Sequence, residues 1–250
     1  MRFQSAVVVV CLCGASLVDA QTRTSSSGPD DNEGTFVRRI SAGATLSVLG
    51  LSLLKGGSTS VTNSTIETTS YSSTAASQRI GYGGTAQLAI SKHMAVSVSA
   101  LLRRIGYTSD TTDTITNGTL SSQTSTHEDT RARLIDIPFL LRYYNRGRHT
   151  AGPRWFVEGG GALRKISGIR TSISSTDASG TLSCCTSTPA VPANRNPMGV
   201  VAGLGMQLID DVGIHVVPEV RYTRWFNPTF DTLTAHSQRN QVEVGLTLSF

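Results

Sequence analysis

The last ten residues of the chain alternate strictly between apolar and polar side chains. The apolar positions are Val242, Val244, Leu246, Leu248 and Phe250, and the polar or small ones are Gln241, Glu243, Gly245, Thr247 and Ser249. Successive side chains of a strand point to opposite faces, so this strand has one apolar and one polar face. If the apolar face meets lipid, every backbone group must be paired within the protein, which only a closed barrel allows.

Similar alternation recurs along the chain in segments long enough for the 9 to 11 residues of a tilted membrane-spanning strand. We expect eight such strands, at residues 38–48, 78–90, 94–105, 131–144, 154–166, 198–209, 212–225 and 239–250. The pattern predicts an all-β chain with period-two faces throughout.

The connections between these segments alternate between long and short. The long ones are 49–77, 106–130, 167–197 and 226–238, and the short ones are 91–93, 145–153 and 210–211. Outer-membrane barrels combine short periplasmic turns with longer extracellular loops. The sequence therefore predicts an eight-stranded antiparallel up-and-down transmembrane β-barrel. A soluble lipocalin-like barrel, whose apolar face points inward, is the alternative. The long loops are rich in Ser, Thr, Asn and Asp, so we expect them to be solvated and mobile and to bury little.

The N-terminus predicts export. Arg2 precedes an apolar run from Ala6 to Leu12, and small residues lead to Ala20, which is the layout of a secretory signal peptide. We divide the chain into a signal peptide at 1–20, a flexible periplasmic lead-in at 21–37 and a barrel at 38–250. The net charge of +5 could suggest nucleic acid, but an exported chain rarely meets it, so no nucleic-acid partner is expected.

The run from Arg133 to Tyr144, RLIDIPFLLRYY, resembles the "IPLLLRY" strand of PorT-like outer-membrane β-barrel domains, which are related to the small eight-stranded barrels of the OmpA/OmpX type. Phe250, the terminal aromatic of an alternating strand, resembles the signal read by periplasmic chaperones and the barrel-assembly machinery. The resemblance implies a bacterial outer-membrane location, with those chaperones and that machinery as partners.

Alternation also predicts what fills the barrel. The inward face collects four carboxylates and four arginines: Asp136, Glu158, Glu219, Glu243, Arg103, Arg142, Arg164 and Arg221. The interior of an eight-stranded barrel is just wide enough for side chains to fill it, so we expect a salt-bridged plug. The rival hypothesis for these residues is acid–base catalysis, which needs a route for substrate.

Basic and aromatic residues gather near the strand ends. Outward-pointing Arg104, Arg133 and Arg224 are candidates to contact lipopolysaccharide phosphates, with plain strand-end solubility as the alternative. Six aromatics are candidates for a membrane-interface girdle: Tyr107, Tyr143, Trp155, Tyr222, Trp225 and Phe226.

The sequence gives little sign of chemistry. His236 and Ser237 weakly resemble the His-x-Ser pattern of lipid A deacylases, but adjacent residues of a strand point to opposite faces. Cys184 and Cys185 are adjacent, and whether they are bridged is left open. No spacing suggests a metal site, and we expect no cofactor. The leading hypothesis is a non-enzymatic structural or surface-binding envelope protein whose polar loops meet an unknown extracellular ligand. A lipid A-modifying enzyme and a narrow channel are the alternatives.

Overall fold

The structure is a computed structural model that describes residues 39–148, 152–184, 190–209 and 213–250. The predicted signal peptide, the lead-in, the turn at Asp210 and Asp211, and Cys185 lie outside the described residues. In the part that is described, no helix is long and apolar enough to cross a membrane.

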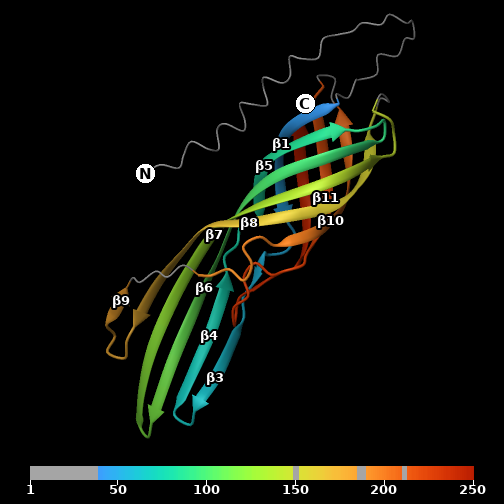
Figure 1. The fold of residues 1–250 in the computed structure, drawn as a ribbon. Coiled ribbons are helices and arrows are strands. Elements are labelled where there is room, and N and C mark those ends of the chain that lie inside the picture. The colour runs from blue at the N-terminus through green and yellow to red at the C-terminus, as the bar shows by residue number, and fades with distance from the viewer. Residues whose placement is uncertain (1–38, 149–151, 185–189, 210–212) are drawn as a thin grey trace, which may run out of the picture.

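Eight antiparallel strands close into a barrel (Figure 1). They are β1 (Ile40–Leu49), β5 (Ile80–Ala89), β6 (Met94–Asn117), β7 (Leu120–Tyr144), β8 (Arg154–Thr176), β10 (Met198–Ile209), β11 (His215–Trp225) and β13 (Asn240–Ser249). Each strand pairs with the next one named. The barrel closes where β13 returns to β1, with Leu46 opposite Leu246. The predicted fold class and strand count are confirmed.

The outer surface of the barrel is apolar. Alternate residues of the barrel strands are large, apolar and exposed: Leu46, Val48, Ile80, Tyr82, Leu88, Phe139, Leu141, Tyr143, Trp155, Val157, Leu163, Val200, Leu204, Val220, Tyr222, Val242, Val244, Leu246 and Leu248. The residues between them, such as Thr45, Ser97 and Thr247, are polar and buried. This is the arrangement of a membrane barrel, and the lipocalin-like alternative is wrong because it requires the reverse.

A second, open part of the sheet projects beyond one end of the barrel (Figure 1). We call it the protruding sheet; it consists of β3 (Ser58–Ser64), β4 (Glu67–Ala75), the far halves of β6, β7 and β8, and β9 (Leu182–Cys184). We expected mobile loops here, and the chain forms paired strands instead. Thr is favoured in strands, and hydroxyl pairs such as Thr130 with Thr171, 2.9 Å apart, join neighbouring strands without an apolar core.

The same end of the barrel is covered by chain that folds back over it. Two short strands, β2 (Leu54–Lys55) and β12 (His236–Ser237), pair with each other. Around them lies an apolar cluster, the mouth cluster, formed by Leu49, Leu53, Leu54, Ile105, Tyr107, Ala132, Leu134, Ile166, Phe230 and Ala235. The Tyr107 and Phe230 rings meet edge to face at 5.8 Å. The connections at 49–77 and 226–238 thus bury apolar side chains, contrary to expectation, because their few apolar residues reach the open end of the lumen.

Candidate functional site

The lumen below the mouth cluster holds a first group of buried charges around Asp136. Arg103 Nη1 lies 2.6 Å from Asp136 Oδ2, and Arg164 Nε lies 2.6 Å from Asp136 Oδ1. The other terminal nitrogen of Arg103 reaches Glu243 Oε1 at 2.8 Å and donates to the Ser47 hydroxyl at 2.7 Å. One carboxylate is therefore held by two guanidinium groups from the neighbouring strands β6 and β8.

A second group of charges forms a closed square. Arg142 lies 2.8 Å from Glu158 and 2.6 Å from Glu219. Arg221 lies 2.8 Å from Glu158 and 2.6 Å from Glu219. Each ion thus has two partners of opposite charge, and this attraction offsets the cost of removing the ions from water.

The structure brings together all eight residues that alternation assigned to the lumen. Each is at least nine-tenths buried and takes part in at least one ion pair. Four guanidinium groups face four carboxylates, so the formal charges cancel. We call these eight residues the charged plug.

Uncharged partners complete the plug, and sequence reasoning missed them. The Gln241 side-chain oxygen accepts hydrogen bonds from Trp225 Nε1 at 2.9 Å and from Arg164 at 3.0 Å. The Gln87 oxygen accepts from Arg142 at 3.0 Å and from the Tyr144 hydroxyl at 3.2 Å. Both glutamines occupy inward positions, so alternation could have placed them, but amides carry no charge to single them out.

Two aromatics assigned to the interface girdle are in fact inside the barrel. Tyr107 and Trp225 are each 4 % exposed, whereas Tyr143, Trp155, Tyr222 and Phe226 are exposed as expected. The Arg164 guanidinium lies 4.0 Å from the centre of the Trp225 ring. The correction follows from period two, because Trp225 is an even number of residues from inward Arg221, as Tyr107 is from Arg103.

Glycines on the inward face make room for the plug. A Cβ on Gly81 would lie 2.6 Å from Arg103 Nε, and one on Gly203 would lie 2.8 Å from Glu158 Oε1. Real Cβ atoms do not approach other heavy atoms so closely. The glycines therefore set the positions that these charged side chains can occupy.

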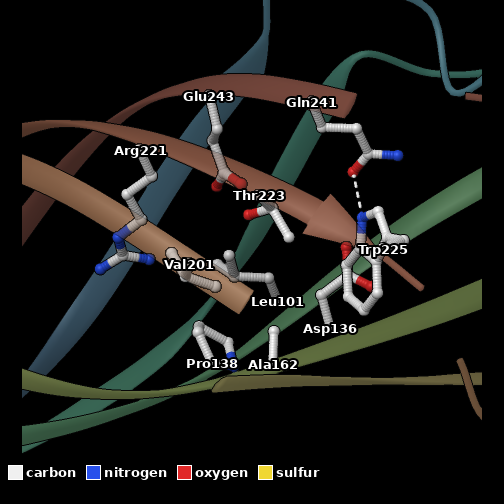
Figure 2. A pocket seen from close by; sticks show the side chains of 10 residues that line it. All are labelled: Leu101, Asp136, Pro138, Ala162, Val201, Arg221, Thr223, Trp225, Gln241 and Glu243. Carbon is white, nitrogen blue, oxygen red and sulfur yellow. Dashed lines mark hydrogen bonds between the residues drawn. The ribbon is translucent and has the colours of Figure 1, made fainter. Parts of the chain in front are cut away.

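A small cavity lies within the lumen. A cavity of about 10 Å³ lies between the two charge groups, bordered by Asp136, Arg221, Trp225, Gln241 and Glu243 among others. Figure 2 shows these side chains, with the Trp225 to Gln241 hydrogen bond beside the cavity. This volume is close to the minimum for a single water molecule.

Outside the barrel, Arg104, Arg133 and Arg224 are exposed, on the side that alternation predicted. Arg104 and Arg133 lie directly opposite each other on β6 and β7. Neither has an ion-pair partner among the described residues. Arg224 lies on β11, where it donates to the Asn240 side-chain oxygen at 3.0 Å.

The candidate enzyme residues are not arranged as a nucleophile and its base. His236 Nδ1 lies 2.6 Å from Asp231, and the Ser237 hydroxyl accepts from the Phe230 backbone N–H at 2.8 Å. No group of three or more His, Cys, Asp or Glu side chains in the described ranges could hold a metal ion. Of the two adjacent cysteines, Cys185 lies outside the described residues.

Comparison with known proteins shows which family this barrel belongs to. A family model described as an outer membrane protein beta-barrel domain matches residues 20–231. The chain belongs to this family. It is an outer-membrane β-barrel protein, as the apolar outer surface and closed antiparallel sheet require. No curated protein matches it significantly.

Solved structures similar to this outer-membrane barrel have low sequence identity to it. OprG from Pseudomonas aeruginosa is 11% identical, with a TM-score of 0.47 over 88% of this chain and 99% of OprG. Ail of Yersinia pestis, solved in complex with the heparin analogue sucrose octasulfate, is 10% identical, with a TM-score of 0.35 over 84% of this chain and 96% of Ail. The translocator domain of autotransporter NalP from Neisseria meningitidis is 10% identical, with a TM-score of 0.24 over 88% of this chain and 90% of that domain.

Proposed function

We propose that this outer-membrane protein is a non-catalytic surface-binding protein, in which the barrel anchors the protruding sheet outside the cell. The observation that carries the proposal is the length of three strands. β6, β7 and β8 run for 24, 25 and 23 residues from the barrel into the protruding sheet. About 9 to 11 residues suffice to cross the membrane, so more than half of each strand serves another purpose.

Loops of outer-membrane barrels are longer on the extracellular side, which orients the protruding sheet outward. Its backbone is held by continuous ladders, for example from Thr108 opposite Asp129 to Asn117 opposite Leu120. A surface that is already ordered loses little conformational entropy on binding, which favours affinity. These features support recognition at the cell surface over a purely structural role in the envelope.

The test shortens the protruding sheet and keeps the barrel. Ser58 pairs with Ser72 and Thr108 pairs with Asp129, so residues 59–71 and 109–128 can each be replaced by an Asn-Gly turn. We call this protein the short-sheet variant. Cells that express the full chain or the short-sheet variant are compared for retention on bare and serum-coated polystyrene, and for sensitivity to detergent.

The proposal expects the short-sheet variant to lose retention while detergent resistance is unchanged. Heat-modifiable migration on semi-native gels verifies that both barrels are folded. Unchanged retention would contradict the proposal. Increased detergent sensitivity with unchanged retention would instead support a role in envelope integrity.

The geometry gives less support to the two alternatives. A channel needs an open lumen, and a lipid A-modifying enzyme needs a nucleophile beside its base. The charged plug occupies the lumen, and the Ser237 hydroxyl is engaged by the Phe230 backbone. Mass spectrometry of lipid A from cells with and without the protein tests the enzyme hypothesis directly.

We also propose that lipopolysaccharide phosphates bind the outward arginines Arg104, Arg133 and Arg224. Like charges directly opposite each other destabilise a sheet, and Arg104 faces Arg133 in this way. A phosphate between them would offset the repulsion and accept charge-assisted hydrogen bonds from both guanidinium groups.

Replacement of all three arginines by Gln should lower the amount of lipopolysaccharide that co-purifies with the folded barrel. The matched control replaces Lys92 and Arg146, exposed cations at the short-turn end, and should leave that amount unchanged. Equal lipopolysaccharide in wild-type and triple-variant preparations would contradict the contact.

We propose that periplasmic chaperones and the barrel-assembly machinery recognise Phe250, whose ring is exposed and whose backbone N–H donates to the Ala42 carbonyl at 3.1 Å.

We also propose that, within its family, this protein belongs to the PorT-like barrels. The run from Arg133 to Tyr144 supports this proposal.

A further inference from the structure

The protruding sheet ends in an edge strand that carries neither charge nor proline, and its pairing with β4 is regular up to Thr62, where the register shifts. β3 is the outermost strand and pairs only with β4 among the described residues. All seven of its residues are exposed, and its sequence, STSVTNS, contains no charge and no proline. Natural edge strands usually carry charges or proline that prevent another strand from adding to them. Figure 1 shows β3 at the rim of the protruding sheet.

The pairing with β4 determines which backbone groups of β3 are free. The Ser73 N–H donates to the Gly57 carbonyl at 2.8 Å, and the register continues regularly from Ser58 opposite Ser72 to Thr62 opposite Thr68. In an antiparallel pair, hydrogen-bonded and non-hydrogen-bonded positions alternate. The backbone groups of Thr59 and Val61 therefore point to β4, and those of Ser58, Ser60 and Thr62 point outward from the edge.

This edge is complementary to itself. In two antiparallel copies related by a two-fold axis at Val61, Ser60 of each copy lies opposite Thr62 of the other. Both residues have free backbone groups, so they form hydrogen-bonded pairs. The two Val61 side chains then meet on the axis at a non-hydrogen-bonded position, where the Cα atoms lie about 4.5 Å apart. No like charges lie opposite each other in this pairing, because β3 contains no charged residue.

We propose that β3 pairs with β3 of a second copy of this chain located in a facing membrane. The two-fold axis of an antiparallel pair is perpendicular to the sheet, so it reverses the long axis of the second molecule. Two copies in one membrane point the same way, so their β3 strands run parallel to each other. Two identical edges that face each other in parallel about a two-fold axis cannot both make the hydrogen bonds of a parallel ladder. Self-pairing of this edge therefore joins two membranes.

The edge is held clear of the membrane. Val61 pairs with Thr69, and Thr69 pairs with Asp113 of β6. Asp113 follows Ile105 of the mouth cluster by eight residues, which is about 25 Å along a strand. Both copies extend equally, so their barrels stay separated when the edges meet.

A single such contact is weak. Pairing of two short strands buries less than the roughly 1,200 Å² of a stable specific complex. Two facing membranes present many copies, however, and each contact raises the effective concentration of the next. This inference rests on the proposed surface-binding function and names the partner that the protruding sheet meets.

The experiment uses the full chain reconstituted into two populations of phosphatidylcholine vesicles, one with a donor lipid dye and one with an acceptor. Energy transfer between populations reports clustering. Wild-type vesicles should cluster, and Val61→Lys in both populations or Val61→Glu in both should slow clustering by about tenfold or more, because like charges then meet on the axis. Vesicles with Val61→Lys mixed with vesicles with Val61→Glu should cluster again.

The matched control is Leu120, an exposed apolar residue at the tip of the β6–β7 hairpin. Leu120→Lys vesicles, alone or mixed with Leu120→Glu vesicles, should cluster as wild type does, which excludes attraction between whole vesicles. Heat-modifiable migration confirms that each variant is folded.

Three results would overturn the proposal: wild-type vesicles that stay separate, Val61 variants that cluster normally, or opposite charges at Val61 that do not restore clustering. If any of these occurs while the short-sheet variant still abolishes cell retention, self-pairing is wrong and the surface-binding function stands. If cell retention is also unaffected, the surface-binding function is wrong as well.

Discussion

At the scale of single residues, the barrel depends on balanced buried charge. Arg142 joins two carboxylates of the charged plug, Glu158 and Glu219, and also donates to Gln87. Without Arg142, Arg221 would be the only cation of the square that neutralises Glu158 and Glu219. An unpaired buried charge is far more costly than an absent pair.

Arg142→Met should therefore lower the free energy of unfolding by about 3–5 kcal/mol. Urea titration of the protein in phospholipid vesicles, followed by Trp fluorescence, measures the change. Arg146→Met is the control because Arg146 is exposed, and it should cost less than about 0.5 kcal/mol. Equal effects of the two substitutions would show that the plug does not stabilise the fold.

The terminal residue should matter for assembly more than for stability. Phe250 is 65 % exposed and outside the plug, so we expect Phe250→Ala to reduce the folded fraction in cells several-fold and to leave refolding into vesicles nearly unchanged. Leu248→Ala, which removes a comparable exposed apolar side chain from the same strand, is the control. The folded fraction is read from heat-modifiable migration, and an equal loss in both variants would contradict a specific signal.

At the scale of elements, alternation predicted where each barrel strand lies, but β6, β7 and β8 run 10 to 12 residues beyond the predicted ends at 105, 131 and 166. The expected strands at 198–209 and 239–250 correspond to β10 and β13 within one residue. Alternation could not predict the protruding sheet, because stretches such as Ser109 to Thr114 are polar on both faces. Whether such residues form strands depends on a neighbouring strand to pair with, which the local sequence does not reveal.

The period-two alternation that predicted the barrel strands also predicted the residues of the charged plug. Asp136 and Arg142 are charged residues on the inward side of an otherwise apolar run, and period two assigns them to the lumen. Their specific partners were not predictable, since Arg142 and Glu219 are 77 residues apart. The role of Phe230 was also hidden, because it belongs to a connection without periodicity.

The mouth cluster depends on Phe230, which is 2 % exposed and contacts Tyr107. Phe230→Ala should reduce the free energy of unfolding by about 3–5 kcal/mol, as for other large buried aromatics. Leu233 on the same connection is 70 % exposed, and Leu233→Ala should have little effect. Urea unfolding midpoints compare the two variants, and similar midpoints would mean that the connection does not pack over the lumen in solution.

The turn between β8 and β9 should respond to pH. The pKa of Asp177 is lowered because its carboxylate accepts a hydrogen bond from the Ser179 hydroxyl and others from the backbone N–H groups of Thr181 and Ser179. A lowered pKa means that this stabilisation is fully present above the ordinary pKa of aspartate. It is lost as the pH falls through the lowered value.

Ser179→Ala should raise the pKa of Asp177 toward its ordinary value, since the largest cause of the shift is removed. NMR titration of the carboxyl carbon measures it, with Ser183→Ala in β9 as the control. An unchanged pKa in Ser179→Ala would show that the hydroxyl does not hold the carboxylate.

At the scale of the whole molecule, the barrel is obstructed in two places. The mouth cluster covers one opening, and the charged plug occupies the lumen beneath it. We expect the protein in planar bilayers to show no stepwise conductance, because the mouth cluster and the charged plug both lie across the lumen. Regular conductance steps that disappear with heat-unfolded protein would contradict a closed lumen.

The uninterrupted course of β6, β7 and β8 also determines how the molecule would bear force. A pull on the far end of the protruding sheet is carried along covalent backbone directly into the barrel, because each strand continues through the junction, where the β7–β8 register shifts between Arg131 and Arg133. Ladder hydrogen bonds lie across the strands, so such a load shears many of them together instead of opening them one by one. The protein is thus constructed as a tether that should resist tension on the cell surface far better than a barrel with flexible loops.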